Sequence, residues 1–369
     1  MKKRLKKVLV WTAVVLVLVL AVIALGAWRM FGTFVVAARS IEKLEDGLYA
    51  MEYKGDYGFD EFLARGGAAD DSAVADYLIG FLSRGYYKKT DHEIKPGDYG
   101  CSTVCVKDGN GAVVFGRNFD WEKGRAMIVH TMPEKGYESF STCCLDFLGF
   151  GDDYTPDGSM QERIQTLAAI YVPLDGMNEK GLIVADLMAG DMEETHQKTG
   201  KPALTTTTAI RLLLDRAANV DEAVELLKQY DMNSSIGAAH HFSIADASGK
   251  SVVVEYANGE MLVTETPVVT NHYLADCPKK GVGSAQSHER FDTLAAQTEA
   301  GDAAGARSLL QSVAQSNYQQ PDGDPEATLW SIVYTPEKGS ADFYSSEKFD
   351  RGFRLQLGKK DGFLDHFIY

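Results

Sequence analysis

The chain has 369 residues, of which 45% are hydrophobic and 10% aromatic, a composition typical of a folded protein with a large core. The formal net charge is -15, and because residues 1–7 alone carry +5, residues 8–369 sum to -20. A body this acidic repels phosphate backbones, so no nucleic-acid partner is expected, whereas net charge says little about a small-molecule pocket.

The N-terminus has the pattern of a membrane anchor. A basic stretch, residues 1–7, precedes an apolar stretch, residues 8–28, and about 20 apolar residues suffice to span a bilayer as a helix. The apolar part of a secretory signal is shorter. The basic cluster predicts a cytoplasmic N-terminus, so residues 1–29 form a tail and single-pass anchor in the cell membrane and the chain after Arg29 is extracytoplasmic. The alternative is a secreted protein, cleaved near residues 24–27.

Residues 30–100 are expected to form a helical pro-segment and linker. Two stretches, "SIEKLEDGLYAMEY" (40–53) and "DDSAVADYLIGFLSRGYY" (70–87), place apolar residues at helical spacing. The polar stretch "KKTDHEIKPGDYG" (88–100), with its proline and glycines, then predicts a linker and a domain boundary.

From Cys101 onwards the pattern changes to β-structure. "CSTVCVKDGNGAVVFGRNFD" (101–120) contains two apolar runs joined by a strong hairpin turn at 108–111. Further strands are predicted in 178–188, 241–271, 327–346 and 353–357, and helices in 207–231, where Asn219 and Glu222 have the spacing of a capping box. Strands, then helices, then strands predict a single α+β layered domain over residues 101–369.

All five cysteines lie in the part expected outside the cell: Cys101, Cys105, Cys143, Cys144 and Cys277. An odd count leaves at least one free thiol or an intermolecular bridge. Apart from Cys101, they are interpreted as inert small hydrophobes or members of a disulfide whose pairing stays open. There is no CxxC pair and the histidines are scattered, so no zinc site is indicated. The adjacent His240 and His241 are interpreted as one core and one surface residue.

Cys101 differs from the other cysteines because of the glycine before it. If the Gly100–Cys101 bond is cut, the cysteine gains a free α-amino group, whose pKa of about 8 makes it a usable base near neutral pH. That amine can take the proton of its own thiol, so one residue supplies both nucleophile and base. Gly100 suits the cut position because a residue without a side chain tolerates a strained backbone.

Two charged residues return beside the thiol on the second strand of the predicted hairpin. Arg117 and Asp120 follow Cys101 by 16 and 19 residues, so both are expected within side-chain reach of it. We expect Asp120 to hold the ammonium group, and Arg117 to stabilise the thiolate and lower its pKa.

These residues resemble a known family. Cys101-Ser102-Thr103 followed by "GRNFDW" (116–121) is similar to the N-terminal nucleophile (Ntn) hydrolases that cleave linear amides: choloylglycine (bile salt) hydrolases, penicillin V acylases, acid ceramidases and acyl-CoA:6-aminopenicillanate acyltransferases. Later blocks of the family are matched in order by "GMNEKGLIVADL" (176–187), "VVVEY" (252–256), "VVTNH" (268–272), "SHERFDTL" (287–294) and "TLWSIVY" (328–334). The resemblance covers most of 101–369 and implies a four-layer αββα sandwich.

The resemblance also implies roles for individual residues. Cys101 is the nucleophile and its amine the base, supported by Arg117 and Asp120. Asn271 matches the oxyanion-hole asparagine, whose side-chain NH₂ points at the developing negative oxygen. Arg290 matches a second arginine near the thiol. One departure is Met188, which stands where bile salt hydrolases have an asparagine and which changes the substrate pocket.

The expected activity is hydrolysis of a linear amide through a Cys101 thioester, after autocleavage at Gly100–Cys101. No metal or organic cofactor is implied, because the amine and thiol suffice. The long segment before Cys101 resembles the ceramidase and acyltransferase branches, in which a helical pro-segment stays bound, so bile salts are not the favoured substrate. Two alternatives stay open: an acyltransferase that passes the acyl group to an amine, and an unprocessed surface binding protein. The substrate is expected to be a small N-acyl amide; its identity and the oligomeric state stay open.

Overall fold

The computed structural model describes residues 2–85, 100–151, 153–298, 301–316, 327–359 and 362–368. The predicted linker, residues 88–100, therefore lies outside the described residues except for Gly100.

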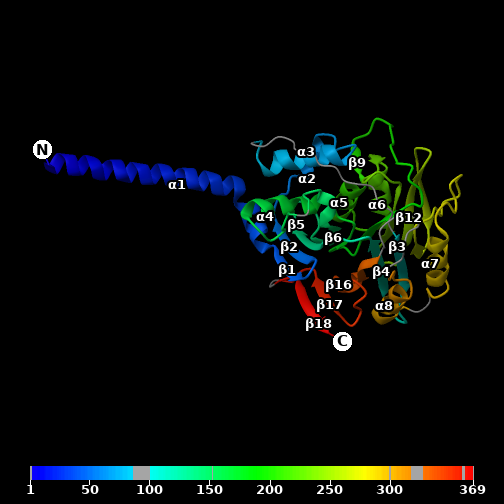
Figure 1. The fold of residues 1–369 in the computed structure, drawn as a ribbon. Helices are drawn as coiled ribbons and strands as arrows, with labels where there is room; N and C mark the ends of the chain where they lie inside the picture. The colour runs from blue at the N-terminus through cyan, green and yellow to red at the C-terminus, as the bar shows by residue number, and fades with distance from the viewer. Residues whose placement is uncertain are drawn as a thin grey trace.

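The first element is a helix of 39 residues, α1 (Lys2–Ser40), which projects from the body of the protein (Figure 1). Its projecting part is exposed, and by length and composition this helix is able to cross a membrane. Its last turns belong to the body: Phe34, Ala37 and Ala38 are buried, and Arg163 donates to the carbonyl of Ala38. The apolar stretch and the start of the folded domain are thus one continuous helix.

The predicted helix over residues 40–53 is wrong. Most of this stretch forms an antiparallel hairpin of β1 (Glu42–Glu45) and β2 (Leu48–Lys54), with Gly47 in the turn at a φ of 75°. β2 then pairs in parallel with β5 (Ala126–Met132). Because β2 is buried on both faces, consecutive residues are apolar, and such a run resembles a helical pattern more than an alternating strand.

Two helices follow the hairpin, α2 (Phe59–Ala64) and α3 (Asp71–Leu82). The helix predicted over 70–87 is therefore confirmed for most of its length. Asp70 caps its start, because its side chain accepts a hydrogen bond from the backbone N–H of Ala73.

The strands form two large sheets. The nine-stranded sheet has the order β1-β2-β5-β6-β7-β8-β11-β12-β13, and the seven-stranded sheet has the order β14-β3-β4-β15-β16-β17-β18. The further strands of the first are β6 (Ser139–Cys144), β7 (Asp175–Asn178), β8 (Ile183–Met188), β11 (His240–Ala245), β12 (Ser251–Ala257) and β13 (Glu260–Glu265). Those of the second are β14 (Val268–Val269), β3 (Gly100–Lys107), β4 (Val113–Trp121), β15 (Ala327–Thr335), β16 (Ser340–Ser345), β17 (Arg351–Gln356) and β18 (Leu364–Ile368). Two short strands, β9 (Ala203–Thr205) and β10 (Asp231–Asn233), pair separately.

Apolar clusters lie between the sheets and on their outer faces. The cluster between them joins residues of both, such as Ile128 of β5 and Ile332 of β15. A second cluster packs the nine-stranded sheet against α2, α3, α5 (Thr206–Arg216) and α6 (Val220–Leu227). A third packs the seven-stranded sheet against α7 (Ala285–Ala295) and α8 (Ala303–Ser312). The remaining helices are α4 (Met160–Thr166) and the short 3-10 turns Leu145–Leu148, Leu167–Tyr171 and Pro336–Lys338.

Several smaller predictions have definite outcomes. Asn219 caps α6 by accepting from the N–H of Glu222, but the Glu222 carboxylate accepts from the backbone N–H of Ala218 and the side-chain NH₂ of Asn219, not from the backbone N–H of Asn219, so the capping box is only half formed. All five cysteines have free thiols. The interpretation of His240 and His241 as one core and one surface residue is wrong: both are buried, because each has a carboxylate of the same sheet as its partner.

Candidate active site

The site begins at the β3–β4 hairpin, whose register brings Cys101 opposite Phe119 and Gly100 opposite Asp120. The turn is closed by Asp108, whose side chain accepts from the backbone N–H groups of Asn110 and Ala112. The hairpin predicted from the sequence is therefore present, and it returns Arg117 and Asp120 to the cysteine.

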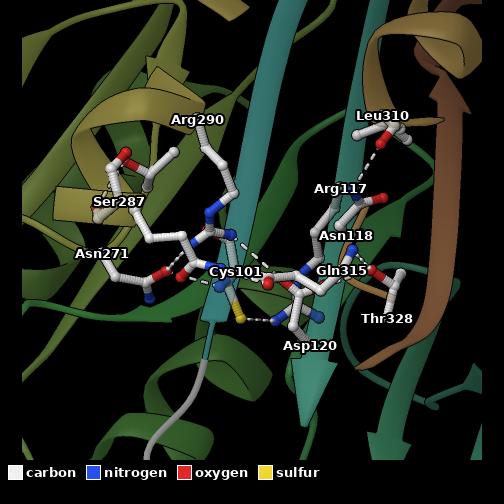
Figure 2. Close-up of polar contacts among 12 residues, drawn as sticks. Cys101, Arg117, Asn118, Asp120, Asn271, Ser287, Arg290, Leu310, Gln315 and Thr328 are labelled. Atoms are coloured by element: carbon white, nitrogen blue, oxygen red, sulfur yellow. Dashed lines mark hydrogen bonds and ion pairs between the residues drawn. The ribbon is translucent and has the colours of Figure 1, made fainter. Parts of the chain in front are cut away.

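Cys101 is enclosed by polar contacts on its backbone as well as on its thiol (Figure 2). Its backbone N–H donates to Asn271 Oδ1 at 2.7 Å, and its carbonyl accepts from Arg290 Nη1 at 3.0 Å. The thiol sulfur lies 3.6 Å from Arg117 Nη2. The structure thus brings three of the predicted residues, Arg117, Asn271 and Arg290, together around the buried cysteine.

Asp120 and Arg290 complete this network. Arg290 Nη1 also contacts Asp120 Oδ2 at 3.0 Å, and its Nη2 donates to Asn271 Oδ1 at 2.9 Å. The other oxygen of Asp120 accepts from the hydroxyl of Thr328 at 2.7 Å. Asn271 Nδ2 donates to the carbonyl of Met188 at 3.1 Å, which leaves the second proton of this NH₂ group for another acceptor.

Burial dominates the acid–base properties of the two central groups. It raises the pKa of the Cys101 thiol to about 12, although the nearby Arg117 acts in the opposite direction. It also raises the pKa of Asp120 to about 6, against the lowering effect of Arg290 and of the hydrogen bond from Thr328. In the continuous chain the cysteine is therefore a neutral thiol at pH 7, and it needs a base before it can attack.

Arg117 is held by a residue that the sequence analysis missed. Asp175 on β7 forms a fully buried ion pair with Arg117. The same carboxylate accepts from the hydroxyls of Thr142 and Tyr334, both at 2.5 Å, and from the indole of Trp330 at 3.3 Å. Four donors around one buried carboxylate fix the position of the guanidinium that faces the thiol.

The end of β8 joins the two sheets at the site. The carbonyl of Asp186 accepts from Arg117 Nη2 at 2.8 Å, and the carbonyl of Met188 accepts from Asn271. Two carbonyls of this strand, two residues apart, therefore position both side chains. The departure noted at Met188 affects the pocket through its side chain, while its backbone holds Asn271.

A pocket opens beside the thiol, with an empty volume of about 230 Å³. It is lined mainly by apolar side chains; the lining residues are Cys101, Phe119, Phe147, Leu174, Asp186, Leu187, Met188, Ile236 and His240. Its polar part is a buried pair in which His240 Nδ1 contacts both oxygens of Asp186 at 2.9 and 3.0 Å. The other ring nitrogen of His240 faces the carbonyl of Ser235 at 2.9 Å, so the two acceptors favour a ring protonated on both nitrogens. Although burial acts against this charge, Asp186 raises the pKa of His240.

Comparison with known sequences identifies two relatives. Residues 166–349 match the family model of acyl-coenzyme A:6-aminopenicillanic acid acyl-transferase, a range that includes Asn271 and Arg290. A penicillin V acylase from Pectobacterium atrosepticum is 34% identical over 100 residues, which are 24% of this chain and 26% of that protein. The chain thus matches about a quarter of the length of this curated relative.

Comparison with solved structures identifies the same fold. A mutant of conjugated bile acid hydrolase from Clostridium perfringens superposes with a TM-score of 0.53 at 18% identity, covering 73% of this chain and 97% of that one. A second variant of that enzyme gives 0.53 at 17% identity with the same coverage. Penicillin V acylase from Agrobacterium tumefaciens gives 0.50 at 20% identity, covering 71% and 87%. With these relatives and this fold, the chain belongs to the linear amide C–N hydrolase group of the Ntn hydrolases.

Proposed function

We propose that this protein is a cysteine Ntn hydrolase that cleaves a linear N-acyl amide bond, with Cys101 as nucleophile after autocleavage at Gly100–Cys101. The observation that carries the proposal is the environment of the Cys101 backbone nitrogen. It is buried and lies 2.7 Å from the carboxamide oxygen of Asn271, while the thiol faces Arg117. An amine formed at this nitrogen has an acceptor in place and its own thiol as the nearest acid.

The proposed reaction uses the contacts described above. The free amine of Cys101 takes the thiol proton, and the thiolate beside Arg117 attacks the carbonyl carbon of the amide. The free proton of the Asn271 NH₂ group stabilises the oxyanion. The leaving nitrogen takes the proton back from the Cys101 ammonium and departs as the amine, which leaves a Cys101 thioester. Water then hydrolyses the thioester to the carboxylic acid and the free thiol. Asp120 holds Arg290, and this arginine fixes the positions of Cys101 and Asn271 relative to each other.

Support for the roles of Cys101 and Arg117 comes from the two bile acid hydrolase structures. One of these proteins carries a substitution of a cysteine and the other a substitution of an arginine. The two substituted positions are 16 residues apart, which is also the separation of Cys101 and Arg117. The apolar lining of the pocket favours an apolar acyl group as the part of the substrate next to the thiol.

A second candidate is acyl transfer to an amine, because the matching family model is that of an acyltransferase. The two candidates differ only in what attacks the thioester. Incubation with an N-acyl substrate and hydroxylamine or a free amino acid separates them. A hydrolase gives mainly the carboxylic acid, whereas an acyltransferase gives mainly the acylated acceptor.

We further infer that the two sheets and their covering helices form a four-layer αββα sandwich, and that the segment before Cys101 stays bound after cleavage. β2 pairs along seven residues with β5, and the buried hydroxyl of Tyr57 donates to Asp215 at 2.6 Å. Because α1 continues into this segment, non-covalent packing would keep the catalytic part on the membrane. Protease added to intact cells is expected to remove the protein beyond Arg29; a protected catalytic domain would contradict this topology.

Intact mass measurement with N-terminal sequencing tests the proposed maturation. The purified full-length protein is expected to contain a fragment that begins Cys-Ser-Thr-Val, and the Cys101→Ala variant is expected to lack it. Fully active protein with an intact Gly100–Cys101 bond would overturn the mechanism, because an amide nitrogen cannot act as the base. A screen of N-acyl amino acids, N-acyl amines, N-acyl homoserine lactones and β-lactam side-chain amides then identifies the substrate.

A further inference from the structure

Gln315 lies at the proposed cleavage junction and has no role in the reaction described so far. It follows α8, and its backbone is fixed by β15: its N–H donates to the Thr328 hydroxyl at 2.8 Å, and its carbonyl accepts from the Thr328 N–H at 2.9 Å. Its side chain is 5% exposed and lies near Cys101 and Asp120 (Figure 2). A polar side chain this deeply buried needs a partner for each of its polar atoms.

The oxygen of the Gln315 carboxamide has a hydrogen-bond donor, whereas its NH₂ group is not fully hydrogen-bonded. Its oxygen accepts from Gln286 Nε2. Its Nε2 lies beside Asp120, and a hydrogen bond from it is among the contacts that lower the pKa of Asp120, but the second proton of this NH₂ group has no acceptor among the described residues. The opposite orientation would put the carboxamide oxygen beside the Asp120 carboxylate, which is electrostatically unfavourable. The unsatisfied group is therefore an N–H donor.

This donor lies beside Gly100. A Cβ atom added to Gly100 would lie 3.1 Å from Gln315 Nε2 and 3.0 Å from Asp120 Oδ2. Ordinary side chains do not fit in so small a space without displacing one of these groups. The missing side chain of Gly100 thus lets the residue whose carbonyl is to be attacked sit against an unused donor.

We propose that Gln315 acts in the maturation of the protein, as a hydrogen-bond donor to the Gly100 carbonyl oxygen while the Gly100–Cys101 bond is cut. This inference rests on the autocleavage in the proposed function. It assigns to the precursor a donor separate from the NH₂ group of Asn271, which donates to the carbonyl of Met188.

The step balances with water as the only further reactant. The Cys101 thiol loses its proton to a neighbouring base, and the sulfur forms a bond to the carbonyl carbon of Gly100. The electron pair of the C=O bond moves to the oxygen, where Gln315 Nε2 donates. Collapse breaks the C–N bond, and the nitrogen of Cys101 takes up the proton and becomes the free amine. Water then hydrolyses the thioester, which releases the Gly100 carboxylate and regenerates the thiol.

The test compares the rate of self-cleavage with the turnover per cleaved active site. Gln315→Met keeps the length of the side chain and removes the donor. Loss of one oxyanion donor typically costs about 10²- to 10³-fold, so cleavage of the full-length precursor is expected to slow by that factor. Turnover of an N-acyl substrate, normalised to the fragment beginning at Cys101, is expected to fall much less. The control is Gln311→Met, the same change at an exposed position of α8, which is expected to cleave at the wild-type rate.

Hydroxylamine and a second variant locate the affected step. Hydroxylamine cuts thioesters, so it should not restore cleavage of the Gln315→Met precursor if the acyl shift itself is slow; rescue would overturn the proposal. Gln315→Glu has nearly the same shape, and its carboxyl can donate only when protonated. Its cleavage rate relative to wild type is therefore expected to rise as the pH falls, and a constant ratio would also count against the proposal.

The outcomes separate this inference from the proposed function. Wild-type protein that never cuts itself would refute the maturation and this inference together. Wild-type protein that cuts itself while Gln315→Met cuts equally fast would refute only the role of Gln315. Equal losses in cleavage and in turnover per cleaved site would show a general effect on the site, and would likewise refute a role specific to the precursor.

Discussion

The two sheets contribute to the site in different ways. The seven-stranded sheet supplies Cys101, Arg117 and Asp120 from one hairpin, so their meeting is decided by local register. The nine-stranded sheet supplies Asp175 and the carbonyl of Asp186, which reach Arg117 across the space between the sheets. The first region carries the groups proposed to react, and the second fixes where they point.

The comparison also explains how Arg117 is tolerated in the core. Its guanidinium is fully buried, and a charge in such a place is costly unless it is paired and hydrogen-bonded. Asp175 provides the opposite charge, and the ring of Phe119 lies 5.0 Å from the guanidinium carbon. The two sheets therefore have to be assembled before this side chain of the hairpin is stable.

The largest expected effect is at the nucleophile. Cys101→Ala removes the only sulfur in contact with Arg117 Nη2 among the described residues, so both self-cleavage and amide hydrolysis should fall to background. Cys105→Ala is the matched control, because Cys105 lies four residues further on the same buried strand, and it should keep both activities. Amide hydrolysis assays and intact mass measure the two effects. Amide hydrolysis by Cys101→Ala would show that the hairpin of the seven-stranded sheet does not carry the nucleophile.

The next effect tests the supporting sheet. Asp175→Asn leaves the buried Arg117 without its counter-ion, and breaking a buried ion pair typically costs about 3–5 kcal/mol of unfolding free energy. Denaturant titration of the detergent-solubilised full chain measures this loss. The control, Asp365→Asn, breaks the exposed pair with Lys359 and should cost less than about 1 kcal/mol.

A double variant separates stability from activity at the same pair. Arg117→Met with Asp175→Leu replaces two buried charges by apolar groups, which is often neutral or stabilising. It should recover only part of the stability, because the hydroxyls of Thr142 and Tyr334 and the indole of Trp330 lose their acceptor. It should not restore hydrolysis, because the thiolate loses its cation. Recovery of activity as well would mean that this pair only supports the fold.

The part of the site on the seven-stranded sheet could be predicted from the sequence better than the part on the nine-stranded sheet. The hairpin and its charged residues were predictable because the turn at 108–111 fixes which positions face each other. Asn271 and Arg290 depended on the family resemblance. Asp175 could have been suspected only from its position just before the family block "GMNEKGLIVADL", since nothing local indicates that its partner is 58 residues away.

The error at residues 40–53 has a related cause. β2 is buried on both faces, because helices pack on one side and the second sheet lies on the other. Met51 and Tyr53 join the cluster under the helices, while Leu48 and Ala50 join the cluster between the sheets. An alternating pattern predicts a strand only where one face is exposed to water. Tertiary packing therefore removed the signal on which the sequence analysis relied.

A smaller loss is expected at Asn271, which is held by both sheets. Asn271→Ala removes one proposed oxyanion donor and should lower kcat by about 10²- to 10³-fold with little change in KM. Asn271→Asp keeps an oxygen toward the Cys101 nitrogen but has no NH₂ group, so it should lose about as much. Steady-state kinetics on the screened N-acyl substrate measure both. A defect confined to KM would place Asn271 in substrate binding.

The smallest expected effect is a shift in pH dependence caused by Thr328 on β15. Burial raises the pKa of Asp120 to about 6, and the hydrogen bond from Thr328 is among the contacts that lower it. Protonation of the Cys101 amine, with a pKa of about 8, already lowers kcat/KM on the acid side. Since Asp120 must be ionised to hold Arg290, kcat/KM should show a further fall as the pH drops below about 6. Thr328→Val removes a bond to the charged form, so the pKa should rise and this acid limb should move to higher pH. A hydrogen bond to a charged group is worth about 1.5–3 kcal/mol, which corresponds to a shift of roughly one pH unit or more. Thr328→Ser retains the hydroxyl and should keep the wild-type profile. A pH–rate profile that is identical in all three proteins would show that the titration of Asp120 does not control the reaction.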